Sequence, residues 1–163
     1  METFNSNIDK WNVSQDSEAK YIDTNFTLEY RDKWGAIYVS KRRSPTVFIC
    51  KILMPYVLED DFKKLILQCT TIAQKTGCDK FIFDKRLLRT FHQPSTEWYY
   101  VHWKPLMYQQ FQLKKHRKLF IMEEWFLKCI EVGRNEIYRK HPTNVCHTLD
   151  IKVCKDLEDA INN

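Results

Sequence analysis

The sequence predicts an α/β fold, with a mixed sheet of about five or six strands and helices packed on the sheet. Two observations indicate this class: strand-like runs come first, and helical and strand patterns then alternate along the chain. The 163 residues fit one domain. Apolar residues are scattered without a period over residues 1–24, so we expect a flexible N-terminal arm there and the domain over residues 25–163.

Three antiparallel strands are expected at the start of the domain. They are rich in β-branched and aromatic residues, and the turn signals RDKWG and RRSP separate them. Their sequences are FTLEY (26–30), AIYVSK (36–41) and TVFICKIL (46–53).

The next elements are a helix and a buried strand. Apolar residues recur at helical spacing from Phe62 to Ala73, acidic residues precede them, and Gly77 follows. Acidic side chains suit the positive end of the helix dipole, and glycine suits the left-handed conformation that ends many helices. The run KFIFD (80–84) has no polar alternation, which is typical of a strand covered on both faces.

The second half alternates helices and strands. A helix should begin at Pro94 with Ser95 or Thr96 as its N-cap, and Pro105 should either kink it or divide it into two short helices that meet near Lys104. Further elements follow from composition and spacing: a strand KLFIM (118–122), a helix from Phe126 to Ile137, a strand LDIKVC (149–154) and a short helix from Asp156.

Charge and cysteine content restrict the function classes. The net charge of +5 comes partly from residues 41–43 and 114–118, which we interpret as solvated turns, so no nucleic-acid partner is expected. The six cysteines have no zinc-like spacing, and Cys146 and His147 would point to opposite faces of a strand, so no metal is expected. Only three glycines are present, which excludes the common nucleotide-binding loops and predicts no cofactor.

The first twenty residues lack the basic cluster and apolar stretch of a signal peptide. The longest apolar run, residues 52–58, is much shorter than the ~20 residues of a transmembrane helix. The expected location is therefore the cytoplasm.

Several segments together resemble SpoIIAA-like proteins of the STAS superfamily, especially small bacterial members. The resemblance is carried by the order of elements from residue 25, the strand ending FIFDKR, the later RKLFIM and the closing DIKVCKDLEDAIN. It implies a STAS-like domain acting as a non-enzymatic protein-interaction or regulatory module, whose partner is another protein or a second copy in a homodimer. Topological analogy with CRAL-TRIO lipid-transfer domains implies an alternative, a carrier of an apolar or lipid-like small ligand.

Two short segments, a strand end and a helix start, match the functional region that the resemblance implies. Asp84 and Arg86 end a central strand, where open α/β sheets place their sites, although Asp84 can also serve a structural role by pairing with Lys85 or Arg86. Ser95 and Thr96 open the next helix, where anti-sigma-factor antagonists carry a regulated serine in an Asp-Ser-x-Gly motif. Here Pro94 precedes Ser95 and Thr96-Glu97 follow it, so both the Asp and the Gly of the motif are missing and plain capping is favoured.

The aromatic segment from Trp98 to Trp103 raises a further possibility. At 100° per residue, Tyr99 and Trp103 share one helix face, whereas Tyr100 points elsewhere and Trp98 and His102 lie at the edge. One buried stripe cannot hold all of these side chains. Either another part of the chain covers them, or they form a partner surface or the wall of a ligand pocket. The residues concerned are Trp98, Tyr99, Tyr100, His102, Trp103 and, on the following helix, Trp125.

A third reading is an enzyme that uses Asp84 with His92 or His102. No second carboxylate lies at a spacing that predicts a catalytic pair with Asp84, so we expect no catalytic residue.

Overall fold

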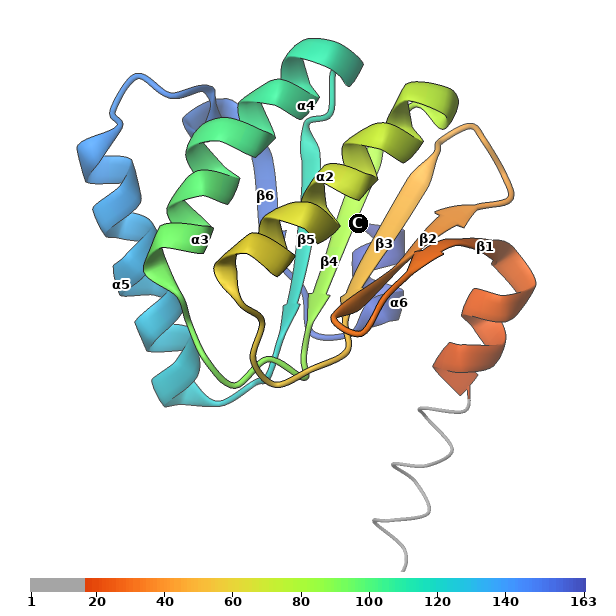
Figure 1. The fold of residues 1–163 in the computed structure, drawn as a ribbon, viewed down its shortest axis with the longest axis horizontal. Helices are drawn as coiled ribbons and strands as arrows, with labels where there is room; N and C mark the ends of the chain where they lie inside the picture. The colour runs from red at the N-terminus through yellow and green to blue at the C-terminus, as the bar shows by residue number, and fades with distance from the viewer. Residues whose placement is uncertain (1–16) are drawn as a thin grey trace, which may run out of the picture.

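The computed structural model describes residues 17–163, and they form a six-stranded mixed sheet with helices on both faces (Figure 1). The strands lie in the sheet in chain order; the first three pair antiparallel and the later neighbours pair parallel. Their bounds are β1 (Phe26–Arg31), β2 (Gly35–Ser40), β3 (Val47–Ile52), β4 (Lys80–Lys85), β5 (Lys115–Phe120) and β6 (Asp150–Val153). The predicted α/β class and its antiparallel start are confirmed.

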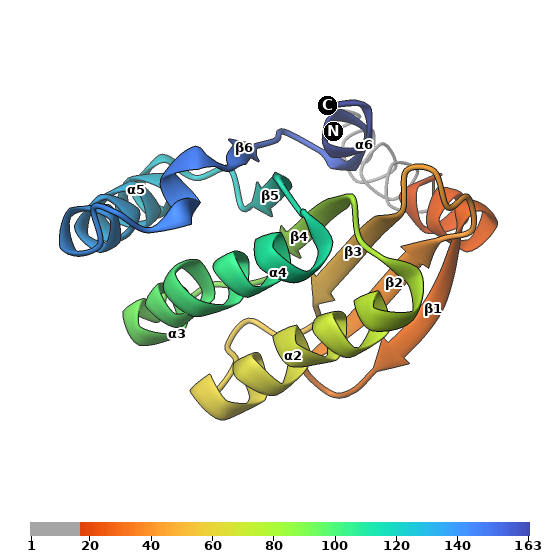
Figure 2. The same ribbon diagram turned by 90° about the horizontal axis from the view of Figure 1, so that it is seen from above.

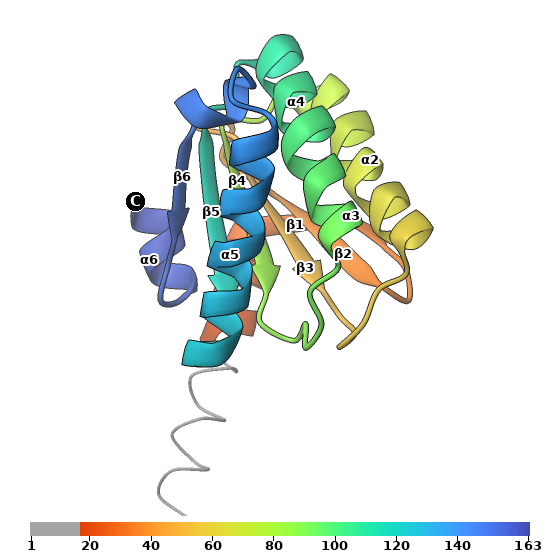
Figure 3. The same ribbon diagram turned by 90° about the vertical axis from the view of Figure 1, so that its left-hand side faces the viewer.

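The three parallel crossovers place their helices on one face of the sheet (Figure 2). Parallel crossovers are right-handed as a rule, so strands added in one direction send every connecting helix to the same side. These helices are α2 (Glu59–Thr76), α3 (Gln93–Trp98), η1 (Tyr99–Trp103), α4 (Lys104–Phe111) and α5 (Glu124–Lys140). A short 3-10 turn η2 (Val145–Thr148) leads into β6. The opposite face carries α6 (Leu157–Asn162), which is seen beside β6 in Figure 3, and a helix over residues 17–25, which is seen in Figure 2.

The strongest local patterns give the elements they predict. Apolar residues of α2 are buried, and Gly77 ends this helix with φ 72° and a hydrogen bond from its N–H to the Ala73 carbonyl. The strand β4 is buried along its whole length, as its apolar run indicates. Asp156 caps α6 by accepting a hydrogen bond from the Asp159 N–H at 2.8 Å.

The structure corrects the expected arm at the N-terminus. Residues 17–25 are helical, and Ile22 is buried in a core cluster with Ile82 and Leu119 of the sheet. A single apolar contact of this kind leaves no period in the sequence, which is why the pattern did not reveal the helix. The rest of the expected arm, residues 1–16, lies outside the described residues.

The second basic run is also corrected. Residues 114–118 were expected to be a solvated turn, but β5 begins at Lys115, and His116, Arg117 and Lys118 are buried. Charged residues alternate across the two faces of this strand, and each face offers a different environment. The first run, residues 41–43, is an exposed turn as predicted.

Candidate functional site

The aromatic segment is core rather than surface at three of its positions. Tyr99, Tyr100 and Trp103 are at most 1% exposed. They all face inward because the turn Tyr99–Trp103 is π-helical: the Lys104 N–H bonds the Tyr99 carbonyl, five residues back. The extra residue in this turn widens the buried stripe, so it holds Tyr100 beside Tyr99. The expectation that Tyr100 points away from the core was wrong for this reason.

Pro105 contributes to this local geometry, as the expected kink near Lys104 suggested. Proline has no N–H, so the Val101 carbonyl lacks its partner one turn later in the helix. The Asn144 side chain replaces it, donating from Nδ2 to the Val101 oxygen at 3.2 Å. The helix therefore continues from α3 through η1 into α4.

The remaining aromatic candidates lie at the surface or its edge. Trp98 is half-buried beside the Phe62 ring, and His102 is exposed. Trp125 is 58% exposed at the start of α5. The structure therefore separates the expected aromatic surface into a buried part and isolated exposed rings.

Asp84 has a structural partner in Arg86. The buried Asp84 carboxylate accepts from Arg86 Nε at 2.9 Å and from Nη2 at 2.8 Å. The same guanidinium donates to both carboxylate oxygens of Glu18, at 2.9 and 2.8 Å. Arg86 thus ties the helix over residues 17–25 to the end of β4.

His92, and not Ser95 or Thr96, caps the helix that follows β4. The His92 Nδ1 atom accepts from the Ser95 N–H at 3.3 Å and lies 2.7 Å from the buried Ser95 hydroxyl. Because a backbone N–H can only donate, Nδ1 is unprotonated and the Ser95 hydroxyl donates to it. The Thr96 hydroxyl donates to the His92 carbonyl at 3.1 Å. The sequence prediction missed histidine because it is not a common cap residue.

Lys85 shares a small pocket with the Ser95 and His92 pair, at the carboxyl end of β4. The pocket has a volume of 40 Å³. Its lining combines apolar side chains with a few polar groups: Val57, Phe62, Lys85, Leu88, Thr90, Phe91, His92, Ser95, Thr96 and Tyr99. Open α/β sheets bind ligands at the carboxyl ends of their strands, so this is the position where the fold favours a site.

The environment of the Lys85 amine is apolar. Its Nζ lies 4.7 Å from the centre of the Phe83 ring and 4.5 Å from that of Phe120. Burial lowers the pKa of Lys85 to about 7, which makes the neutral amine a major form near neutral pH. The sequence does contain a signal for this position: Lys85 follows Phe81 and Phe83 at the period of two that turns one face of a strand to the helices.

Two more buried lysines lie behind the pocket. Lys104 of α4 is 0% exposed and Lys118 of β5 is 2% exposed. Burial, followed by the nearby charge of Lys85, lowers the pKa of both amines well below the ordinary lysine value. Within residues 17–163, none of the three amines forms a salt bridge, and Lys104 Nζ has no hydrogen-bond partner.

Exposed apolar side chains surround this end of the sheet. The loops that follow β3, β4 and β5 gather at its lower edge in Figure 1. They carry large apolar side chains that are 46% to 59% exposed, namely Tyr56, Leu58, Leu87, Met122 and, at the start of α5, Trp125. We refer to these five residues as the carboxyl-end surface. Backbone hydrogen bonding links two of the loops, with the Arg89 N–H donating to the Pro55 carbonyl at 2.9 Å.

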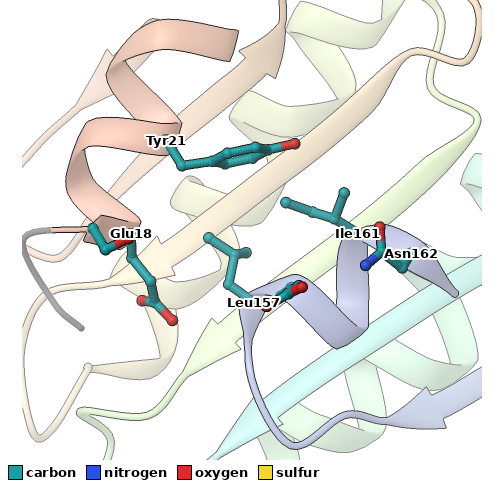
Figure 4. Close-up of a pocket in the computed structure, with 7 residues that line it drawn as sticks. Glu18, Tyr21, Leu157, Ile161 and Asn162 are labelled. Carbon is teal, nitrogen blue, oxygen red and sulfur yellow. The ribbon is translucent and has the colours of Figure 1, made fainter.

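A larger hollow lies on the opposite face of the sheet. It is a groove of 320 Å³ between the helix over residues 17–25 and α6. In Figure 4, Tyr21 lies across from Leu157 and Ile161, with Glu18 and Asn162 at the ends of the groove.

Comparison of the chain with models of protein families, with curated proteins and with solved structures finds no match. Among residues 17–163, no cluster of histidine, cysteine and acidic side chains could hold a metal ion. In the same part of the chain, no helix is long and apolar enough to cross a membrane.

Proposed function

We propose that the chain is a non-enzymatic protein-interaction module of the STAS-like type, and that it binds its partner through the carboxyl-end surface. The observation that carries this proposal is the position of five large exposed apolar side chains at one edge of the sheet. Single exposed apolar residues are common, but a group of them from adjacent loops is typical of interaction sites.

The types of residue support a protein partner. Tryptophan, tyrosine and methionine are enriched at protein interfaces, and the carboxyl-end surface contains Trp125, Tyr56 and Met122. Leu87 extends from the loop after β4, between the loops after β3 and β5 in the sheet order. A partner that covers this edge would therefore contact all three loops at once.

The test compares exposed substitutions on and off this surface. Trp125→Ala and Leu87→Ala should each weaken the complex about tenfold, because large apolar anchors supply most of the binding free energy at an interface. The complex would be isolated from the source cells by tagging the chain, and its affinity measured by sedimentation, with self-association of the pure chain measured in parallel.

Val132→Ala is the matched control, because Val132 lies on the same helix as Trp125 and is 65% exposed but is not part of the carboxyl-end surface. It should leave the affinity unchanged. Equal affinity for the double variant Trp125→Ala, Leu87→Ala and for the unmodified chain would contradict the proposal.

The groove in Figure 4 favours a second candidate function, a carrier of an apolar small ligand. Its volume of 320 Å³ lies within the range of small-molecule sites, and Leu157 and Ile161 give it an apolar wall. Native mass spectrometry of the chain should then show an added small mass that Ile161→Trp removes by filling the groove. Val153→Trp, at an exposed position on β6, is the control. Equal retention of the ligand in both variants would exclude this groove.

A further inference from the structure

Lys85 lies where an amine is uncommon, in the wall of a mostly apolar pocket. The residue is 8% exposed, and its Nζ lies 4.7 Å from the centre of the Phe83 ring and 4.5 Å from that of Phe120. The Tyr99 ring, at 5.8 Å from Nζ, closes the side toward the helices. An amine so enclosed has lost most of its hydration and gains no ion pair in return.

Desolvation, and not a neighbouring charge, favours the neutral form of Lys85. The groups that face it from other elements include Lys104 on α4 and Lys118 on β5, and both are cationic when protonated. Cys50 on β3 acts in the opposite direction only as a thiolate. Lysines become nucleophiles when they are desolvated in an apolar pocket, and this condition is met at Lys85.

A proton-transfer pair lies in the same pocket. The Ser95 hydroxyl donates to His92 Nδ1 at 2.7 Å, and both residues line the pocket together with Lys85. The hydrogen bond of the Ser95 hydroxyl is not needed to cap the helix, because the Ser95 backbone N–H already donates to His92 Nδ1. The hydroxyl can therefore pass a proton to or from a group that is bound beside the amine.

We infer that Lys85 is a covalent binding site for a small aldehyde, held as a Schiff base on Nζ in the pocket that Lys85 shares with Ser95 and His92. The neutral amine attacks the carbonyl carbon, and the carbonyl oxygen takes up a proton to give a carbinolamine. The hydroxyl group of the carbinolamine then takes up a second proton, and the C–O bond breaks to release water. The nitrogen loses its two protons as the C=N bond forms. Amine and aldehyde thus give imine and water, with no oxidant or reductant.

The size of the pocket limits the aldehyde. A volume of 40 Å³ holds about three water molecules, so an aldehyde of about three non-hydrogen atoms fits beside Nζ. Phe62, Leu88 and Phe91 bound this space, so an aromatic aldehyde requires the pocket to open. This aldehyde site is separate from the proposed interaction function, because the pocket contains none of the residues of the carboxyl-end surface and needs no partner.

The test measures how fast individual lysines react. The unmodified chain is treated at pH 7.5 with acetaldehyde and a mild reductant that fixes the imine, and the ethylated peptides are followed by mass spectrometry. Lys85 should react about tenfold faster than Lys128, an exposed lysine on α5, because most of the Lys85 amine is neutral at this pH. No substituted chain is required, so loss of folding cannot affect the result.

Benzaldehyde distinguishes a shaped site from an amine that is simply reactive. With benzaldehyde, Lys85 should no longer react faster than Lys128, because the aromatic ring is larger than the space beside Lys85 Nζ. Ser95→Ala provides a further measurement: the Lys85 rate with acetaldehyde should fall severalfold while the Lys128 rate stays the same. Equal rates for Lys85 and Lys128 with acetaldehyde, or the same ratio with both aldehydes, would overturn the assignment.

Discussion

The two faces of the central strands bury cations in opposite ways. On the face toward α6, Lys80 donates to the Ala160 and Ile161 carbonyls at 3.0 and 2.7 Å. Arg117 on the same face donates to the Asp150 carboxylate and to the Asn163 carbonyl, at 2.9 and 2.7 Å. On the face toward the longer helices, Lys85, Lys104 and Lys118 contact aromatic rings and form no salt bridge within the described residues.

This difference separates structural cations from candidate functional ones. The carbonyl end of a helix attracts positive charge, so Lys80 and Arg117 fix the last turn of the chain against the sheet. The amines on the other face have no comparable partner, and their burial opposes folding at any pH where they are charged. Among them, only Lys85 lines the pocket at the carboxyl end of β4.

The largest expected effect is on the pH dependence of stability. Lys85 has a pKa of about 7 in the folded chain and about 10.5 when unfolded, so between these values the unfolded state binds the extra proton. Stability therefore rises with pH in this window, and Lys85 alone should add about 2 kcal/mol to the free energy of unfolding between pH 7 and 9. Lys104 and Lys118 act in the same direction. Urea unfolding at pH 7, 8 and 9 measures the rise.

Two features sharpen this prediction. Burial raises the pKa of the Cys69 and Cys78 thiols, so above pH 9 these thiols ionise more readily in the unfolded state and oppose the rise that the lysines produce. The Lys85→Met variant should lose about 2 kcal/mol of the rise. A profile that is flat or falls from pH 7 to 9 would show that the amines are not held neutral.

On the paired face, Arg117→Met should destabilise the chain by about 3 kcal/mol. The substitution removes the hydrogen bonds of a 1% exposed guanidinium to Asp150 and to the chain end. Because the Asp150 side chain keeps partial access to solvent, the expected loss of stability lies at the lower end of the range for breaking a buried ion pair. Urea unfolding measures the free energy, and hydrogen exchange in α6 should accelerate. A loss of stability under about 1 kcal/mol would contradict this prediction, because it would mean that Arg117 contributes no more than an exposed salt bridge does.

On the unpaired face, a matched substitution should have the opposite sign. Lys104→Met should stabilise the chain by about 2 kcal/mol at pH 7, because methionine fills a similar volume without a buried unsatisfied donor. Urea unfolding of this variant is compared with Lys128→Met at an exposed position, which should change stability by less than about 0.5 kcal/mol. Destabilisation by Lys104→Met would remove the distinction between the two faces.

Local patterns predicted most of the fold, and the misses share a cause. The helix α2 and the strand β4 were predicted from spacing and from Gly77, because their signals lie within a few residues of each other. The start of β5 was missed because its cations look like a turn, and the group that pairs with Arg117, Asp150, is distant in the sequence. The sequence offered Arg86 as a partner for Asp84, and the structure contains this pair, whose members are only two positions apart.

The sequence by itself determined the α/β class, the order of the six strands and the burial of β4, because hydrophobic periodicity is a local property of the chain. Only the tertiary structure decided which cations are paired, that a π-helical turn buries Tyr100, and that Lys85 shares a pocket with Ser95 and His92. These outcomes depend on contacts between separate elements. A side chain's electrostatic environment is set by whatever the fold brings to it, and the local sequence does not contain that information.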